Sequence, residues 1–212
     1  MNLSNFVDWT GHNLPFSLRP REVIRTSGAS GLARALRLNY SLTYLDLRCN
    51  AISDSGAAAI AEALKSNCTL TELYLNENKI GESGGESLGK ALQSNCTLAH
   101  LLLGGNRIGD SGAKAIAKAL QSRGTQLTCL DLGSNKISCS VATAIADYLQ
   151  CNCSLTHWLL SHNKIGSSGA VAVAKALQSD CTLTHLGECE RMMLLIKEPQ
   201  NWYRLFCITI IP

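Results

Sequence analysis

The spacing of hydrophobic residues along this chain switches repeatedly between that of a strand and that of a helix. In LTELYLNENKI, residues 70–80, Leu73 and Leu75 alternate with polar neighbours, which predicts a short strand with both leucines on its buried side. In AAAIAEALKS, Ile60 and Leu64 recur with helical spacing, which predicts a helix with one apolar face. Polar turns that contain glycine separate strands from helices. The pattern therefore predicts a unit of one strand, one turn and one helix.

This unit is repeated through most of the chain. Five segments follow the pattern Leu-x-x-Leu-x-Leu-x-x-Asn-x-Ile: LTYLDLRCNAI, LTELYLNENKI, LAHLLLGGNRI, LTCLDLGSNKI and LTHWLLSHNKI, the last with Trp158 in a leucine position. Such a pattern, with a period of about 20–29 residues, is typical of leucine-rich repeats. Because one unit cannot cover its own apolar side, the units are expected to stack on one another.

The repeat also places five asparagines at equivalent positions, 28, 28, 29 and 28 residues apart. An inward amide at this position can bond to backbone groups of the bend and of the neighbouring repeat, which would otherwise be buried without partners. The predicted asparagine ladder consists of Asn50, Asn78, Asn106, Asn135 and Asn163.

The stretch from about Ile24 to Leu186 resembles the ribonuclease-inhibitor-like class of leucine-rich repeats. Its units LTELYLNENKIGESGGESLGKALQSN and LLLGGNRIGDSGAKAIAKALQS look most like the repeats of NOD-like receptors of the CARD-containing subfamily. The resemblance implies an α/β solenoid in the form of a right-handed horseshoe, with parallel strands on the concave face and helices on the convex face. It also implies a cytoplasmic location and a role in sensing or regulating innate immune signalling. The nucleotide-binding and death-fold domains of those receptors do not fit within this chain.

The periodic pattern sets the expected domain boundaries. The leucine-rich repeat domain is expected to span residues 24–186, with five full repeats and a partial repeat at each end. Residues 1–23 are expected to form an N-terminal flank or cap. Glu188 and Arg191 replace the leucine and asparagine of the pattern, so residues 187–212 are an atypical tail. This tail either covers the open end of the solenoid or is a foreign end with an aggregation-prone edge.

One glycine-rich segment is similar to the loop that binds nucleotide phosphates. It is GESGGESLGKAL, residues 81–92. In the repeat register, Gly89 takes the place of a core-facing alanine and Lys90 a position that holds either sign of charge. Ala91 stands where the phosphate loop requires Ser or Thr. We therefore interpret the segment as a repeat helix rather than a nucleotide site.

The loops between helix and strand carry possible glycosylation sequences. The motif Asn-x-Ser/Thr begins at Asn2, Asn39, Asn67, Asn95 and Asn152. The N-terminus shows no secretory signal, so we attribute these motifs to a repeated Ser-Asn-Cys-Thr loop rather than to glycosylation.

Four of the ten cysteines share one repeat position, two residues before the first leucine of the strand: Cys68, Cys96, Cys153 and Cys181. Strand spacing alone permits disulfides between neighbours. Cytosolic thiols are kept reduced, however, and free cysteine packs well in a core. We therefore expect a buried ladder of free thiols.

Composition excludes several classes of partner. The formal net charge is only +3, Lys and Arg are spread along the sequence, and aromatic residues make up 5% of it, so we expect no nucleic-acid partner. The longest apolar runs are too short to cross a bilayer, so we expect no membrane association.

Side chains that flank the inward leucines are expected on the concave face. A mixture of aromatic, charged and apolar groups on a rigid curved surface favours protein recognition, because Tyr and Arg supply strong anchors. The expected protein-binding residues are Tyr44, Asp46, Arg48, Glu72, Tyr74, Asn76, His100, Leu102, Asp131, His157 and Leu159.

Catalysis and metal binding are not expected. His100, Cys129 and His157 share one column, but at strand spacing the two histidines should lie about 10 Å apart, too far for one tetrahedral ion. No nucleophile elbow or pair of carboxylates is found, so we predict no catalytic residue, metal, cofactor or small-molecule substrate.

The predicted function is therefore a non-catalytic scaffold that binds a protein ligand. An alternative is a regulator that resembles the Ran GTPase activator, which uses a similar repeat. That family usually carries a strongly acidic segment after its repeats, whereas this chain ends in apolar residues.

Overall fold

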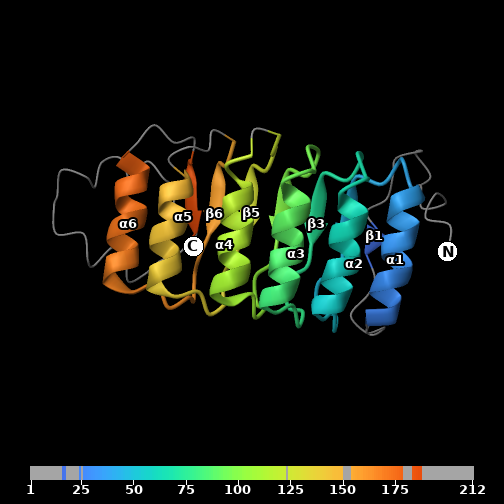
Figure 1. Cartoon of the computed structure of the whole chain (residues 1–212), viewed down its shortest axis with the longest axis horizontal. Helices are drawn as coiled ribbons and strands as arrows, with labels where there is room; N and C mark the ends of the chain where they lie inside the picture. Colours follow the sequence, from blue (N-terminus) through green and yellow to red (C-terminus); the bar gives the residue numbers. More distant parts are fainter. Residues whose placement is uncertain are drawn as a thin grey trace.

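The computed structural model describes residues 16–17, 24, 26–122, 124–149, 154–178 and 183–187. Strands and helices alternate along the chain and form two layers, with the helices side by side in one row over the strands (Figure 1). The strands are β1 (Phe16–Ser17), β2 (Tyr44–Asp46), β3 (Glu72–Tyr74), β4 (His100–Leu102), β5 (Cys129–Asp131), β6 (His157–Leu159) and β7 (His185–Gly187). The helices are α1 (Thr26–Leu38), α2 (Asp54–Leu64), α3 (Glu82–Leu92), α4 (Gly109–Ala119), α5 (Cys139–Leu149) and α6 (Gly166–Gln178).

All seven strands form one parallel sheet in chain order. Equivalent leucines pair across three successive boundaries between repeats: Leu45 with Leu73, Leu73 with Leu101, and Leu101 with Leu130. A slip of one residue would turn every inward leucine to the other face of the sheet, so the buried leucines fix this register. The predicted α/β leucine-rich repeat solenoid is confirmed.

The two ends of the sheet extend the predicted repeats. β1 pairs with β2 and adds a strand within residues 1–23, where the sequence shows no recognisable strand pattern. β7 pairs with β6 and forms the beginning of a sixth repeat strand. The rest of the expected flank, residues 1–15 and 18–23, and the expected tail from residue 188 onward lie outside the described residues.

The core lies between the two layers. In α2 the residues Ala57, Ile60, Ala61 and Leu64 are at most 2% exposed, as their helical spacing predicts. Trp158 replaces a leucine of the pattern and is fully buried, and its indole N–H finds no hydrogen-bond partner in the part of the chain that is described. Burial of an unpaired donor costs free energy, so the apolar area of the large ring must offset it.

Helices α3 and α4 approach each other through glycines. A Cβ built at Gly89 would lie 2.5 Å from the backbone carbonyl carbon of Ala115. A Cβ at Gly85 would lie 2.9 Å from the Cα of Gly112. Gly89 is therefore a contact point between two helix backbones, and the neighbouring Lys90 is exposed.

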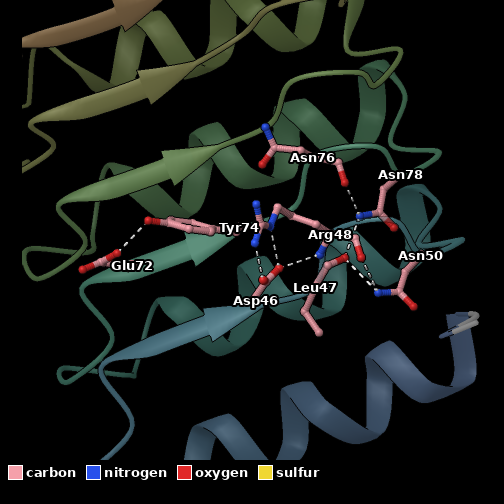
Figure 2. A network of polar contacts seen from close by, with 8 residues as sticks. All are labelled: Asp46, Leu47, Arg48, Asn50, Glu72, Tyr74, Asn76 and Asn78. Atoms are coloured by element: carbon pink, nitrogen blue, oxygen red, sulfur yellow. Dashed lines mark hydrogen bonds and ion pairs between the residues drawn. The ribbon is translucent and has the colours of Figure 1, made fainter. Parts of the chain in front are cut away.

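The asparagines Asn50, Asn78, Asn106, Asn135 and Asn163 line up along the stack and bond to the backbone of the bends. Asn78 is typical: its Nδ2 donates to the carbonyl oxygens of Leu47 at 2.9 Å and Leu75 at 3.0 Å, as Figure 2 shows in part. Its Oδ1 accepts from the N–H of Ile52 at 3.0 Å. Each side chain thus joins its own bend to the preceding repeat and satisfies backbone groups that water cannot reach.

A second ladder of asparagines, which the repeat pattern did not predict, lies at the opposite end of the helices. The Nδ2 of Asn67 donates to the carbonyl oxygens of Leu36 at 3.0 Å and Asn39 at 3.2 Å, and its Oδ1 accepts from the N–H of Leu70 at 2.8 Å. Asn95 makes the equivalent bonds one repeat later. These amides bond to carbonyl groups at the end of the preceding helix, which lack partners within that helix.

In the repeat that is one residue longer, Thr125 takes this position. Its hydroxyl donates to the carbonyl oxygen of Ala119 at 2.9 Å. Asn39, Asn67 and Asn95 are at most 9% exposed, so the Asn-x-Ser/Thr motifs at these positions have a structural role. Asn2 and Asn152 lie outside the described residues.

The expectation of a buried thiol ladder is wrong for the two described members. Cys68 and Cys96 are free and exposed. The inward position of each loop is occupied by the preceding residue, Asn67 or Asn95, and the next side chain therefore turns to solvent. Cys153 and Cys181 lie outside the described residues.

Among the residues that the structure describes, no helix has the length and apolar character needed to span a membrane.

Candidate functional site

The side chains that flank the inward leucines form one surface, which we call the strand face. The sheet register aligns them in columns along the solenoid. One column contains Tyr44, Glu72, His100, Cys129, His157 and His185. A second contains Asp46, Tyr74, Leu102, Asp131, Leu159 and Gly187.

Two tyrosines and an arginine meet at the N-terminal part of the strand face. The rings of Tyr44 and Tyr74 pack edge to face, with centroids 4.9 Å apart and planes at 73°. The guanidinium carbon of Arg48 lies 5.4 Å from the centroid of the Tyr74 ring, within the range of a cation–π interaction. The edge-to-face and cation–π contacts both involve Tyr74, so this ring is the centre of the group.

Two carboxylates fix the orientation of these groups (Figure 2). Asp46 accepts from Arg48 Nε at 3.0 Å and Nη2 at 2.7 Å, a bidentate ion pair. The Tyr74 hydroxyl donates to Glu72 Oε2 at 2.8 Å. We call these five residues, Tyr44, Asp46, Arg48, Glu72 and Tyr74, the Tyr–Arg cluster.

Charge states in the Tyr–Arg cluster follow from these contacts. Burial, the hydrogen bond to Glu72 and the charge of that carboxylate raise the pKa of Tyr74 to about 12, so its hydroxyl stays a donor at neutral pH. Burial by itself would raise the pKa of Asp46, but the hydrogen bonds from Arg48 outweigh it, and the net shift is downward. The cluster therefore offers a positive group held over an aromatic ring, with both neighbouring carboxylates already bonded.

The central part of the strand face contains a hydrogen bond between distant repeats. Asn76 Nδ2 donates to Asp131 Oδ2 at 2.8 Å. Asn76 Oδ1 is buried and has no hydrogen-bond partner among the described residues. Burial raises the pKa of Asp131 above its ordinary value, although the bonds from Gly133 and Asn76 act in the opposite direction.

Cys129 lies beside this pair and is not an activated thiol. Burial, together with the charges of Asp131 and Glu72, raises the pKa of Cys129 to about 11. A thiol with such a pKa is protonated at neutral pH and is a poor nucleophile.

Histidines occupy the C-terminal part of the strand face. The rings of His157 and His185 stack with centroids 4.0 Å apart and planes at 7°. The Nδ1 atom of each ring bonds to the preceding threonine hydroxyl at 2.8 Å, Thr156 and Thr184 respectively. Burial and the nearby His185 and His100 lower the pKa of His157.

His185 lies in the same column of the strand face as His157, although it is not among the expected protein-binding residues. The segment LTHLG, residues 183–187, has a histidine at the same repeat position as His157 in LTHWL. This equivalence in the sequence indicates that His185 belongs to the same column. His100 lies on β4, separated from β6 by β5, and pairs instead with Glu72, with 3.5 Å between Nδ1 and Oε2. In the part of the chain that is described, no three His, Cys, Asp or Glu side chains are arranged to hold a metal ion.

Comparisons with known proteins agree with the repeat architecture. The leucine-rich repeat family model matches residues 39–61, 66–89, 94–117 and 151–174. Comparison with curated protein sequences found no match. Neither result indicates the NOD-like receptor subfamily.

Solved structures share the fold, with 81 matching chains. A structure of leiomodin-1 actin-binding site 2 has a TM-score of 0.60 and 24% identity, covering 70% of this chain and 84% of that chain. A structure of the tropomodulin C-terminal domain from Caenorhabditis elegans has a TM-score of 0.59 and 14% identity, covering 73% of this chain and 90% of that chain. At these identities the likeness establishes the fold alone. The chain therefore carries leucine-rich repeats that stack into a solenoid, with the strand face along one side.

Proposed function

We propose that the chain is a non-catalytic scaffold whose strand face holds a protein ligand. The observation that carries this proposal is the Tyr–Arg cluster. Tyr and Arg are among the residue types that contribute most to binding free energy at protein interfaces. Asp46 and Glu72 already hold Arg48 and Tyr74 in place, so little side-chain entropy is left to lose when a partner binds.

Two partner classes follow from two different observations. The fold is similar to that of a structure named for an actin-binding site in leiomodin-1, which makes actin the first partner to test. The repeat sequences resemble the ligand-sensing or autoinhibitory repeat region of innate immune receptors, which makes a cytoplasmic signalling protein the second. The proposed location of the chain in the cytoplasm rests on the same resemblance.

The test compares three proteins: the wild type, the double variant Tyr44→Ala with Tyr74→Ala, and Tyr40→Ala. Tyr40 is 74% exposed and lies outside the strand face, so its substitution controls for the loss of an exposed tyrosine. Binding is measured by co-sedimentation with actin filaments and by anisotropy with labelled monomeric actin. For a hot-spot pair we expect an affinity loss of roughly tenfold or more in the double variant and none in Tyr40→Ala.

If actin is not bound, the same three proteins are used as baits in cell extract with quantitative mass spectrometry. A protein retained by the wild type and Tyr40→Ala but lost from the double variant supports the scaffold. Equal retention by all three contradicts a role of the Tyr–Arg cluster.

The enzyme-regulator alternative is tested separately. We expect GTP hydrolysis by purified small GTPases to be unchanged when the full chain is added. A faster rate would favour a GTPase-activating regulator over the scaffold.

A further inference from the structure

A second surface of the solenoid carries a row of positive charges. The residue after each ladder asparagine lies in the bend that leads from strand to helix, and in four consecutive repeats it is basic. We call these residues the basic row: Lys79, Arg107, Lys136 and Lys164. All four are exposed. The sequence suggested that Lys and Arg are spread along the chain, but stacking of the repeats brings these four together.

Backbone hydrogen bonds hold the bends at sheet spacing. The N–H of Lys79 donates to Ile52 O at 2.9 Å, and that of Arg107 donates to Ile80 O at 2.8 Å. Lys164 pairs with Ser138 in an isolated parallel bridge. Neighbouring repeats in such a sheet lie about 4.8 Å apart, so the backbone positions of the basic row recur about every 5 Å along the solenoid.

The backbone at Lys136 differs from that at the other three positions. It has φ of 62°, whereas Lys79, Arg107 and Lys164 do not have positive φ. The long flexible stem of lysine gives its ammonium group a wide reach, so a different backbone angle does not remove this charge from the row.

No ion pair neutralises the basic row within the described residues. The nearby carboxylates of Asp54 and Asp110 are bonded to backbone N–H groups of the next repeat, at Gly84 and Ser138. Glu77 and Glu82 are exposed, and their carboxyl groups lie against Gly105 and Gly109, which flank Arg107 in the next bend. Carboxylates thus lie in the same bends, but none of them forms an ion pair with the basic row within the described residues.

Like charges at strand spacing repel each other and lower the stability of the fold. An anionic partner that lies along the row would relieve this repulsion. We propose that the basic row is a binding site for an acidic helix of a partner protein, laid along the solenoid edge. This site is separate from the strand face and does not depend on the function proposed for it.

The spacing of the row favours a helix over other acidic partners. Carboxylates on one face of a helix, at i, i+4, i+7 and i+11, are separated by about 5.5 Å on average along its axis, within about 1 Å of one repeat. In an extended peptide, side chains on one side are about 6.7 Å apart, a mismatch of about 2 Å in each repeat. Phosphates of a nucleic-acid strand rise by about 3.4 Å, and the row contains no aromatic residue on which bases could stack.

The experiment uses the full chain and synthetic peptides of fixed composition. The probe is an alanine-rich helical peptide with glutamates at i, i+4, i+7 and i+11, labelled for fluorescence anisotropy. A second peptide has the same composition with the glutamates distributed around the helix. A single-stranded oligonucleotide and vesicles containing phosphatidylserine are tested under the same salt conditions.

Two protein variants carry equal changes in charge. The row variant replaces Lys79, Arg107, Lys136 and Lys164 with Gln, which lowers the net charge from +3 by four to −1. The control replaces four exposed lysines on the helix layer, Lys90, Lys114, Lys118 and Lys175, with Gln and gives the same net charge. Circular dichroism and thermal unfolding verify that both variants are folded.

We expect the one-faced peptide to bind the wild type and the control variant with affinities within about twofold. Each exposed ion pair contributes a factor of about two, so the row variant should bind roughly tenfold or more weakly. The Tyr44→Ala with Tyr74→Ala double variant should bind the peptide as the wild type does, which separates this proposal from that for the strand face.

Three results would overturn the proposal. One is no binding of the one-faced peptide, and another is equal weakening in the row and control variants, which would show an effect of net charge alone. The third is equal or tighter binding of the distributed peptide, the oligonucleotide or the vesicles.

Discussion

Asn76 donates a hydrogen bond to Asp131 across an intervening repeat, with 2.8 Å between Nδ2 and Oδ2. The two residues are 55 positions apart in the sequence. The repeat between them has Gly104 at this point, and a Cβ there would lie 2.6 Å from Asp131 Oδ2 and 3.0 Å from Asn76 Nδ2. The absence of a side chain at Gly104 thus permits the contact.

Substitution Gly104→Ala should break this hydrogen bond. We expect a loss of about 1 kcal/mol in the free energy of unfolding, because a bond to a charged group contributes more than the gain from a less flexible residue. The pKa of Asp131 should rise further, since the amide of Asn76 acts to lower it. Urea denaturation and carboxyl NMR titration measure the two effects. In a double-mutant cycle with Asn76→Ala the losses should not add, and additive losses would contradict a direct contact.

Substitution Gly89→Ala should destabilise the fold. Alanine in place of glycine within a helix normally stabilises by about 1 kcal/mol. At Gly89 the new Cβ meets the backbone of α4, so we expect a net loss of about 1–3 kcal/mol. Gly31→Ala in α1 is the matched control. No described residue outside its own stretch of helix comes within 4 Å of a Cβ at this position, so the substitution should stabilise the fold. If urea denaturation shows both variants to be more stable than the wild type, this would contradict the close contact between α3 and α4 at Gly89.

Substitution Asn95→Ala should be among the most harmful changes of a polar residue. It leaves the carbonyl oxygens of Leu64 and Asn67 and the N–H of Leu98 without partners in a buried loop. We expect a loss of about 2–4 kcal/mol in thermal or urea unfolding. Thr125→Ala, which removes mainly one bond to Ala119, should cost about 1 kcal/mol. Equal losses in the two variants would rule out the second asparagine ladder as a major source of stability.

Acid should weaken the C-terminal repeats through His157. The pKa of His157 is lowered in the folded chain by burial and by the nearby His185 and His100, so the unfolded chain binds more protons near pH 6. Stability is then full above the ordinary histidine value of about 6.5 and falls as the pH decreases below it. Melting temperatures between about pH 7.5 and 5.5 should drop less for His157→Gln than for the wild type. The control is His162→Gln, which replaces an exposed histidine in the bend after β6. Its melting temperature should drop with decreasing pH as much as that of the wild type. A smaller drop in this control would contradict the role assigned to His157.

The sequence by itself determined the strand and helix of each repeat and the parallel stacking of the repeats. The alternation around Leu73 and the helical spacing of Ile60 and Leu64 are local properties, because burial on one side imposes a period of two on a strand and about 3.6 on a helix. The regular interval between ladder asparagines then predicted parallel stacking in one register. With these features the solenoid and the columns of the strand face could be predicted without coordinates.

Only the tertiary structure decided which side chains meet and which groups they satisfy. Three examples depend on contacts between different repeats. They are the bond between Asn76 and Asp131, the burial of Asn67 beside an exposed Cys68, and the stacking that brings Lys79 near Arg107. A repeat pattern fixes which positions are equivalent, but not the direction of a loop side chain or the space left by a glycine in the next repeat. These depend on the packing of one repeat against another, which is where the free energy of a stacked array is gained.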